Sequence, residues 1–153
     1  FIDELKFAML VSGEIDFNFG YLLQQLAKTV EQQWQLSVEL KMNNLNAEIP
    51  ALLAREIYQI IREGLVNAAR HSHASVVEVD LKADDHNVRV TVADNGCGFP
   101  FRGHYDDAAL ASTGFGPAII KSRVASLDGA LSIDSSESGA RLQVTLPLSS
   151  PRG

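Results

Sequence analysis

In one segment of the chain, apolar and polar residues alternate as they do in a half-buried strand, and a glycine-rich run follows. Residues 88–92 read Val-Arg-Val-Thr-Val, and β-branched residues in alternation favour a β-strand. The strand leads directly into the run Asp94-Asn95-Gly96-Cys97-Gly98-Phe99. Asn-Gly is a strong signal for a hairpin turn, but glycines also let a backbone approach a flat ligand closely. The segment therefore predicts either a tight turn or a binding loop headed by an aspartate.

The residues after this run do not favour a hairpin. Residues 99–105 read Phe-Pro-Phe-Arg-Gly-His-Tyr, which is irregular and contains a proline unsuited to a return strand. An aspartate at the end of a buried strand can accept a hydrogen bond from an exocyclic amine such as that of adenine. From these residues alone, the turn and the ligand site remain equal alternatives.

A long helix, opened by Pro50 and ending near His71, precedes this strand. Its apolar residues recur at helical period: Ile57, Ile60, Ile61, Leu65 and Ala68. Glu63, Asn67 and Arg70 are spaced at i, i+4 and i+7, so they share the other face. An amide oxygen can ligate Mg²⁺, a guanidinium can clamp phosphate, and a carboxylate can orient a water. The same spacing is typical of a solvated helix face, so the helix alone decides nothing.

A second glycine segment opens another helix. Gly114-Phe115-Gly116-Pro117 precedes an apolar run that starts at Ala118. Glycines before a helix free backbone N–H groups for an anion, and the helix dipole favours phosphate there. A lone Gly-x-Gly is weak evidence. The three pieces in this order predict a pocket for a purine nucleotide and a metal.

These pieces resemble the nucleotide-binding boxes of the GHKL ATPase superfamily. Glu63-x-x-x-Asn67 is similar to its N box, Asp94-x-Gly96-x-Gly98 to its G1 box and Gly114-x-Gly116 to its G2 box. The run at residues 139–147 resembles the closing strand, in which a threonine, here Thr145, often helps to hold the site. The superfamily likeness implies an ATP-binding domain.

Residues 62–74 are especially similar to bacterial sensor histidine kinases of the nitrate/nitrite-sensor branch, and the likeness runs from Phe7 to Leu148. The resemblance implies an α+β fold, a two-layer α/β sandwich of the Bergerat type, with about five strands in a mixed sheet covered by three helices. It also implies Mg²⁺ and the transfer of the ATP γ-phosphoryl group to a histidine on a separate helical dimerisation domain. A response regulator would act downstream.

The resemblance also implies roles for individual residues. Asn67 would ligate Mg²⁺, Glu63 and Asn67 would form the catalytic pair, and Asp94 would read the adenine amine. His71, which ends the long helix, is either a ligand contact or a helix-capping residue. The full set expected to bind ATP is Asn67, Arg70, His71, Asp94, Gly96, Gly98, Phe99, Gly114, Phe115, Gly116 and Thr145.

Two departures from the branch pattern bear on the function. The G2 segment lacks the Gly-His-Tyr-Gly-Leu of many branch members, and residues 105–113 make the lid longer than is usual in that branch. The whole lid, residues 99–113, is expected to be irregular. These departures leave two alternatives open. One is a GHKL ATPase or serine kinase, and the other is a degenerate nucleotide-binding module that acts through interaction.

The composition fits a single domain. The chain has 153 residues and a net charge of −6, which argues against non-specific nucleic-acid binding. A single cysteine, Cys97, excludes an internal disulfide and is most simply a small filler. We expect residues 1–16 to be a linker from the acceptor-helix domain, 17–148 to be the ATP-binding domain and 149–153 to be a disordered tail. The resemblance places the domain in the cytoplasm, without membrane contact of its own, in a protein anchored in the inner membrane.

Overall fold

The structure is a computed structural model that describes residues 19–43 and 49–148. The expected linker at residues 1–16 and the expected tail at 149–153 lie outside the described residues. The elements, in chain order, are α2 (Phe19–Trp34), β1 (Ser37–Asn43), α3 (Ala51–His71), β2 (Val76–Ala83), β3 (Asn87–Asp94), β4 (Gly103–Tyr105), α4 (Asp107–Thr113), α5 (Ala118–Ser126), β5 (Ala130–Ser136) and β6 (Gly139–Pro147).

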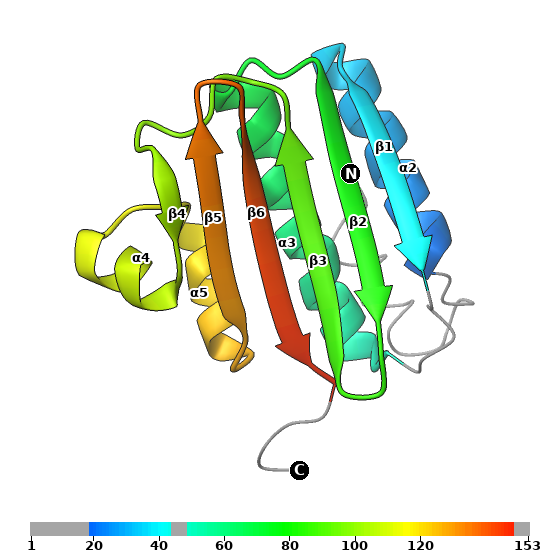
Figure 1. Cartoon of the computed structure of the whole chain (residues 1–153). Helices are drawn as coiled ribbons and strands as arrows, with labels where there is room; N and C mark the ends of the chain where they lie inside the picture. The colour runs from blue at the N-terminus through cyan, green and yellow to red at the C-terminus, as the bar shows by residue number, and fades with distance from the viewer. Residues whose placement is uncertain (1–18, 44–48, 149–153) are drawn as a thin grey trace.

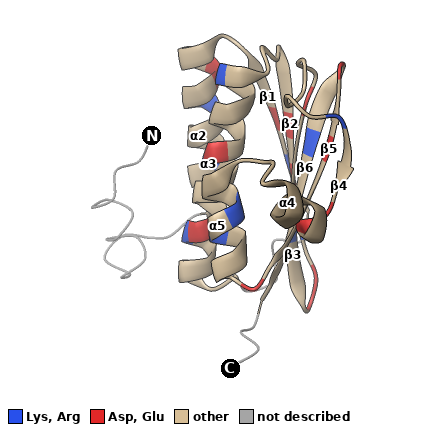
Figure 2. Cartoon of the chain, turned by 90° about the vertical axis from the view of Figure 1, so that its left-hand side faces the viewer, with Lys and Arg blue, Asp and Glu red and all other residues tan. Residues whose placement is uncertain are grey.

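The strands form one mixed sheet in the order β1-β2-β3-β6-β5-β4 (Figure 1). β1 and β2 are parallel, and the other neighbours are antiparallel. Helices α2, α3 and α5 lie against one face of the sheet, and α4 lies at its β4 edge (Figure 2). The α+β class and the two-layer architecture expected from the sequence are confirmed.

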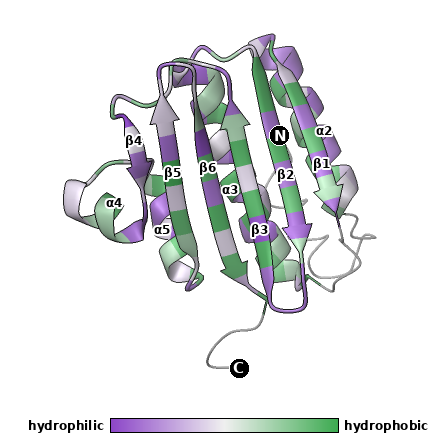
Figure 3. Ribbon diagram, in the orientation of Figure 1, coloured by the Kyte–Doolittle hydropathy of each residue, from purple (hydrophilic) through white to green (hydrophobic). Residues whose placement is uncertain are grey.

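The core lies between the sheet and the three helices. Along β2 and β6, buried apolar side chains alternate with less buried, mostly polar ones, as the hydropathy colouring of Figure 3 shows. The central helix α3 supplies the largest share of the core from its apolar stripe, because residues three and four apart share one face. Its fully buried aliphatic residues are Ile57, Ile60, Ile61 and Leu65. This packing fixes the angle at which the polar end of α3 meets the sheet.

Two counts predicted from the sequence are corrected. The described residues contain six strands rather than five, and four helices rather than three. The additional elements, β4 and α4, lie in the lid segment that was expected to be irregular. β4 is held by backbone pairing, with His104 opposite Asp134 of β5. α4 is capped at its N-terminus by Asp106, whose side chain accepts a hydrogen bond from the Ala109 N–H at 2.9 Å. Neither element is long enough to produce a periodic pattern.

The end of α5 also differs from expectation. The sequence places a glycine, Gly129, in the capping position after the helix. The residue that adopts the left-handed conformation is Asp128, with φ of 55°. Gly129 is required for another reason, because a Cβ there would lie 2.6 Å from Cδ2 of Leu146 and 2.8 Å from the Thr145 oxygen. The glycine therefore lets the chain pass close to β6.

No helix within the described ranges is both long and apolar enough to cross a membrane.

The turn between β2 and β3 is closed by a carboxylate. Asp84 Oδ1 accepts hydrogen bonds from the N–H groups of His86 at 2.8 Å and Asn87 at 2.7 Å. These two bonds, that of His86 first, lower the pKa of the Asp84 carboxyl. A depressed carboxyl pKa stabilises the fold above the unfolded-state pKa of about 4, and this stabilisation is lost as the pH falls through the folded-state pKa.

We therefore expect Asp84→Ala to lower the free energy of unfolding at pH 7, measured by urea denaturation. The difference from wild type should shrink as the pH falls below about 4, because the wild-type carboxylate is then protonated. Asp85→Ala, in the same exposed turn, is the control and should have little effect. A difference for Asp84→Ala that does not change with pH would contradict this account.

Candidate nucleotide-binding site

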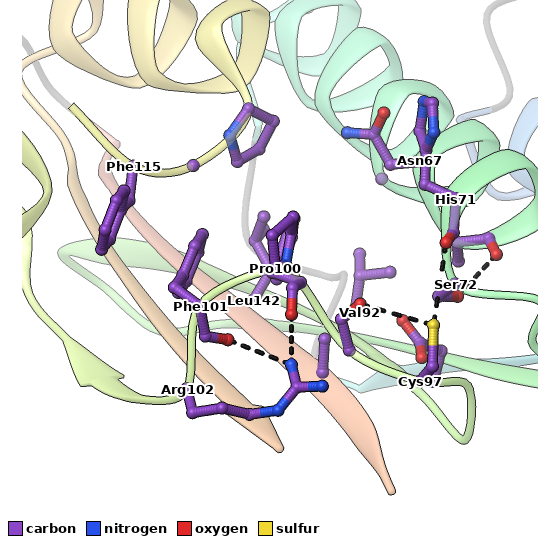
Figure 4. A pocket seen from close by; sticks show the side chains of 18 residues that line it. Asn67, His71, Ser72, Val92, Cys97, Pro100, Phe101, Arg102, Phe115 and Leu142 are labelled. Atoms are coloured by element: carbon purple, nitrogen blue, oxygen red, sulfur yellow. Dashed lines mark hydrogen bonds between the residues drawn. The ribbon is translucent and has the colours of Figure 1, made fainter. Parts of the chain in front are cut away.

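A cavity of about 820 Å³ opens between the C-terminal half of α3 and the two glycine segments (Figure 4). Its size lies within the range of small-molecule sites, about 300–1,000 Å³. Asn67 and His71 project from α3 on one side, and Phe101 and Phe115 lie on the other (Figure 4). The lining residues are Gly64, Asn67, Ala68, His71, Ser72, Val92, Asp94, Cys97, Gly98, Phe99, Pro100, Phe101, Arg102, Phe115, Gly116, Pro117, Ala140 and Leu142.

The wall formed by α3 explains which polar residues of this helix reach the cavity. Gly64, Asn67 and His71 line it at i, i+3 and i+7, which is one face of a helix. Glu63 and Arg70 flank this face and are not among the lining residues. Glu63 is half-buried and Arg70 is exposed. The structure therefore brings Asn67 and His71 to the cavity and leaves the two charged residues at its border.

The segment after β3 contributes to the wall of the cavity and is not a hairpin turn. β3 pairs with β2 and β6, so the chain does not return beside it after Asn95. Asp94 Oδ1 accepts a hydrogen bond from the Gly96 N–H at 2.8 Å. Asn95 Oδ1 accepts from the N–H groups of Ser75 at 2.9 Å and Val76 at 3.0 Å. Asn95 thus holds the loop to the segment that follows α3, and Asp94 remains at the cavity.

Two glycines of this loop are required by close approach of backbone. A Cβ on Gly96 would lie 2.2 Å from the Ser72 oxygen at the end of α3. A Cβ on Gly98 would lie 2.2 Å from the Ser136 oxygen, and Gly98 also has φ of 77°. Neither position has room for a side chain. The loop is therefore pressed between the end of α3 and the β5–β6 turn.

Four aromatic rings join the two glycine segments. The Phe99 and Phe101 rings are stacked with centroids 5.1 Å apart, and the Phe101 and Phe115 rings with centroids 4.8 Å apart. Tyr105 meets Phe101 and Phe115 edge-on, at 5.0 and 5.6 Å. Offset-stacked and edge-to-face pairs are the favoured geometries for aromatic side chains. These rings form an aromatic cluster: Phe99, Phe101, Tyr105 and Phe115. The three phenylalanines line one side of the cavity, and Tyr105 packs against two of them without lining it.

The Gly114–Gly116 turn connects α4 to α5. Gly114 caps α4 with φ of 72°, and Gly116 has φ of 97°. The Phe115 N–H donates to Thr113 Oγ1 at 3.2 Å, so this amide faces the lid helix. Gly116 lines the cavity, whereas Gly114 does not.

Thr145 is not among the residues that line the cavity. Thr145 pairs with Arg89 and Ala130, whereas Ala140 of the same strand pairs with Asp94 at the cavity end. Buried residues of β6 alternate from Ala140, so Thr145 lies on the face of the sheet that the helices do not cover. Side chains of a strand alternate between its faces.

Sequence reasoning missed several lining residues. Val92, Ala140 and Leu142 form an apolar floor from β3 and β6. The strict alternation of both strands could have identified them, because each shares a face with a core residue. Arg102 carried no such signal. Its guanidinium folds back onto the carbonyl oxygens of Phe99 and Phe101.

The side chains at the cavity suit Mg²⁺ only if phosphate oxygens supply further ligands. The described ranges contain no group of three His, Cys, Asp or Glu side chains that could hold a metal ion. Asn67 supplies one amide oxygen at the cavity wall. Mg²⁺ is usually bound through few protein ligands, with substrate phosphates and waters completing the shell. The residues present fit an ion of that kind.

Comparison with known proteins identifies the family. The family model of histidine kinase-, DNA gyrase B- and HSP90-like ATPases matches residues 53–150, which is more than half of the chain. The chain therefore belongs to this ATPase family, and the resemblance predicted from the three boxes is confirmed.

The similar proteins are sensor kinases. The nitrate/nitrite sensor protein NarX of Escherichia coli (strain K12) is 40% identical over 91 residues, which are 60% of this chain and 14% of NarX. The sensor histidine kinase MctS of Rhizobium johnstonii is 28% identical over 137 residues, which are 90% of this chain and 29% of MctS. The chain thus spans less than a third of the length of either relative. The prediction of an ATP-binding domain of the sensor histidine kinase type is confirmed.

A solved structure supports the fold. The histidine kinase domain from the Erythrobacter litoralis EL346 blue-light activated histidine kinase superposes with a TM-score of 0.64 at 21% identity. The match covers 85% of this chain and 65% of that one. At this identity the likeness establishes a shared fold.

The contact between the loop and α3 can be tested by substitution. We expect Gly96→Ala to cost about 1–3 kcal/mol of unfolding free energy, the range for overpacking, because its Cβ must displace the end of α3. Gly114→Asn is the matched control, since no atom lies within 4 Å of a Cβ there and asparagine tolerates a positive φ. Urea denaturation of both variants measures the difference, and equal losses would contradict the steric account.

Proposed function

We propose that this domain binds ATP with Mg²⁺ and supplies the γ-phosphoryl group to a histidine on a separate helical dimerisation domain. One observation carries the proposal: residues from all three boxes line a single cavity, namely Asn67, Asp94, Gly98 and Gly116. Incubation with labelled ATP and a purified acceptor-helix domain tests the transfer. Label on the histidine is the expected result, and hydrolysis without transfer would contradict the kinase assignment.

The base of the nucleotide would lie on the apolar floor. Val92 and Leu142 offer a flat apolar surface, and Asp94 stands at its edge. Asp94 Oδ1 is engaged by the Gly96 N–H, which leaves Oδ2 to accept a hydrogen bond from the exocyclic amine of adenine. A carboxylate accepts but does not donate, so this arrangement favours an amino over an oxo group.

The phosphates would extend toward α3 and the Gly114–Gly116 turn. Asn67 would hold Mg²⁺ through its amide oxygen, with phosphate oxygens and waters as the other ligands. When bound, the ion would supply positive charge that offsets the charge of the transferred group. His71, one turn beyond Asn67 at the cavity, would contact the nucleotide.

The two charged residues at the border of the cavity would act less directly. Glu63 lies one helical turn before Asn67 and would orient a water of the metal shell or the acceptor group. Arg70, which is exposed, would offset phosphate charge from a distance. Phosphoryl transfer depends mainly on positioning and charge neutralisation, so neither residue needs to act as a nucleophile.

The proposed partners follow from the same reading. They are the acceptor-helix dimerisation domain of the same protein and, through the whole kinase, a response regulator. We propose a cytoplasmic position for residues 17–148 in a protein anchored in the inner membrane. The net charge of −6 argues against nucleic-acid binding, which needs a basic surface.

The role of Asp94 predicts a change of base preference. In Asp94→Asn, the side-chain oxygen can keep the bond to the Gly96 N–H while the NH₂ group replaces Oδ2. We expect the binding free energy of ATP to weaken by about 1–3 kcal/mol. The introduced NH₂ group would face the adenine amine, and two donors cannot form a hydrogen bond with each other. Inosine triphosphate, whose 6-oxo group accepts a hydrogen bond, should lose less or gain.

Calorimetry of both nucleotides against wild type and Asp94→Asn measures this preference. Asn95→Ala serves as a control, since it disturbs the loop without changing the group that faces the base. An Asp94→Asn variant that still prefers ATP as strongly as wild type would exclude this role.

The role of Asn67 predicts a loss of metal dependence. We expect Asn67→Ala to remove most of the effect of Mg²⁺ on ATP affinity, because the amide ligand is gone, while the fold is kept. Arg70→Ala is the control on the same helix and should retain the Mg²⁺ titration curve. Identical Mg²⁺ curves for wild type and Asn67→Ala would show that this side chain does not bind the ion.

A further inference from the structure

A lysine from α5 is attached to the Gly114–Gly116 turn. Lys121 Nζ donates to the carbonyl oxygen of Phe115 at 2.8 Å and to that of Leu110 at 3.3 Å. Phe115 lies within the turn, and Leu110 lies in α4. One ammonium group therefore joins α5, the turn and the lid helix.

The two acceptors of this lysine fix the shape of the turn. The Leu110 oxygen also accepts from the Gly114 N–H at 3.0 Å, in the cap of α4. The Phe115 oxygen lies between two glycines that both have positive φ. Glycines give this turn more backbone conformational freedom than other residues would. The hydrogen bond from the charged Lys121 restricts that freedom at the place where the phosphates would lie.

The stem of Lys121 packs against the turn as well. A Cβ on Gly116 would lie 3.4 Å from Cδ of Lys121, which is ordinary contact for a half-buried side chain. Gly116 itself lines the cavity. The ammonium group therefore sits directly behind the part of the turn that faces the cavity.

Other cations near the site are differently engaged. Arg102 donates to the carbonyl oxygens of Phe99 and Phe101. Arg123 forms an ion pair with Glu56, at 2.8 Å. Arg70 is exposed and outside the cavity lining. Lys121 is the cation that the structure ties to the phosphate end.

We propose that Lys121 is a positioning residue for the nucleotide phosphates. It holds the Gly114–Gly116 turn in shape and places a positive charge behind it. Two of its three N–H donors go to the carbonyl oxygens. Lys121 is not among the residues that line the cavity, so its charge would act on the phosphates through the turn. This inference rests on the proposed binding of ATP in the cavity, and it adds a residue outside the three boxes.

The test compares ligands that share the base and differ in phosphate. Affinities of wild type and Lys121→Met for ATP, ADP and adenosine are measured by calorimetry. We expect ATP affinity to fall about tenfold or more, the range for losing a charge-assisted contact, and adenosine affinity to stay unchanged. Lys121→Arg should recover part of the loss. Lys82→Met removes the same charge from an exposed position on β2 and should change none of the affinities.

Each outcome decides the proposal. Unchanged ATP affinity in Lys121→Met overturns it, and so does an equal loss for ATP and adenosine, which would mark a general packing defect. If Lys121→Met does not fold, Lys121→Gln keeps a neutral donor to the carbonyl oxygens, and the same ATP-selective loss is expected. Failure of the wild-type protein to bind any adenine nucleotide would instead refute the proposed function, before the variants are compared.

Discussion

The site depends on how closely the loop after β3 approaches the end of α3. Gly96 lies against the Ser72 carbonyl without room for a Cβ, and the Cys97 N–H donates to that same oxygen at 2.8 Å. Ser72 in turn donates from its hydroxyl to the Ala68 oxygen at 2.6 Å. Through this contact the helix that carries Asn67 and the loop that carries Asp94 become one rigid unit. The positions of Asn67 and Asp94 relative to each other are therefore fixed before a nucleotide binds.

This rigidity is supported by the layered core. The apolar stripe of α3 fixes the helix on the sheet, and the pairing of β3 with both β2 and β6 fixes the strand that ends at Asp94. The lid is attached differently. Three residues of β4, a short α4 and ring contacts hold it, with little buried aliphatic surface. The structure thus combines a rigid half, which carries Asp94 and Asn67, with a half that rests on fewer contacts.

The parts that were predictable are those with long or repeated patterns. α3 and the strands around Asp94 follow from periodicity over many residues, and the glycines follow from their spacing. β4 and α4 could not be found this way, because their pairing and capping depend on partners such as Asp134 and on the position of the β5 edge. The face on which Thr145 lies could not be found either, because it is set by the register of β6 against β3. Lys121 carried no local signal, since its acceptors are two backbone carbonyl oxygens, and their position depends on how the Gly114–Gly116 turn folds.

The aromatic cluster restrains movement of the Gly114–Gly116 turn relative to the loop after β3. Phe101 contacts rings on both glycine segments, so the turn cannot move away from the loop without separating stacked pairs. Such pairs contribute about 0.5–1.5 kcal/mol each beyond the burial of their area. The barrier they impose acts on a molecule leaving as much as on one arriving. We therefore expect these rings to influence how long a nucleotide stays in the cavity, without contact to its phosphates.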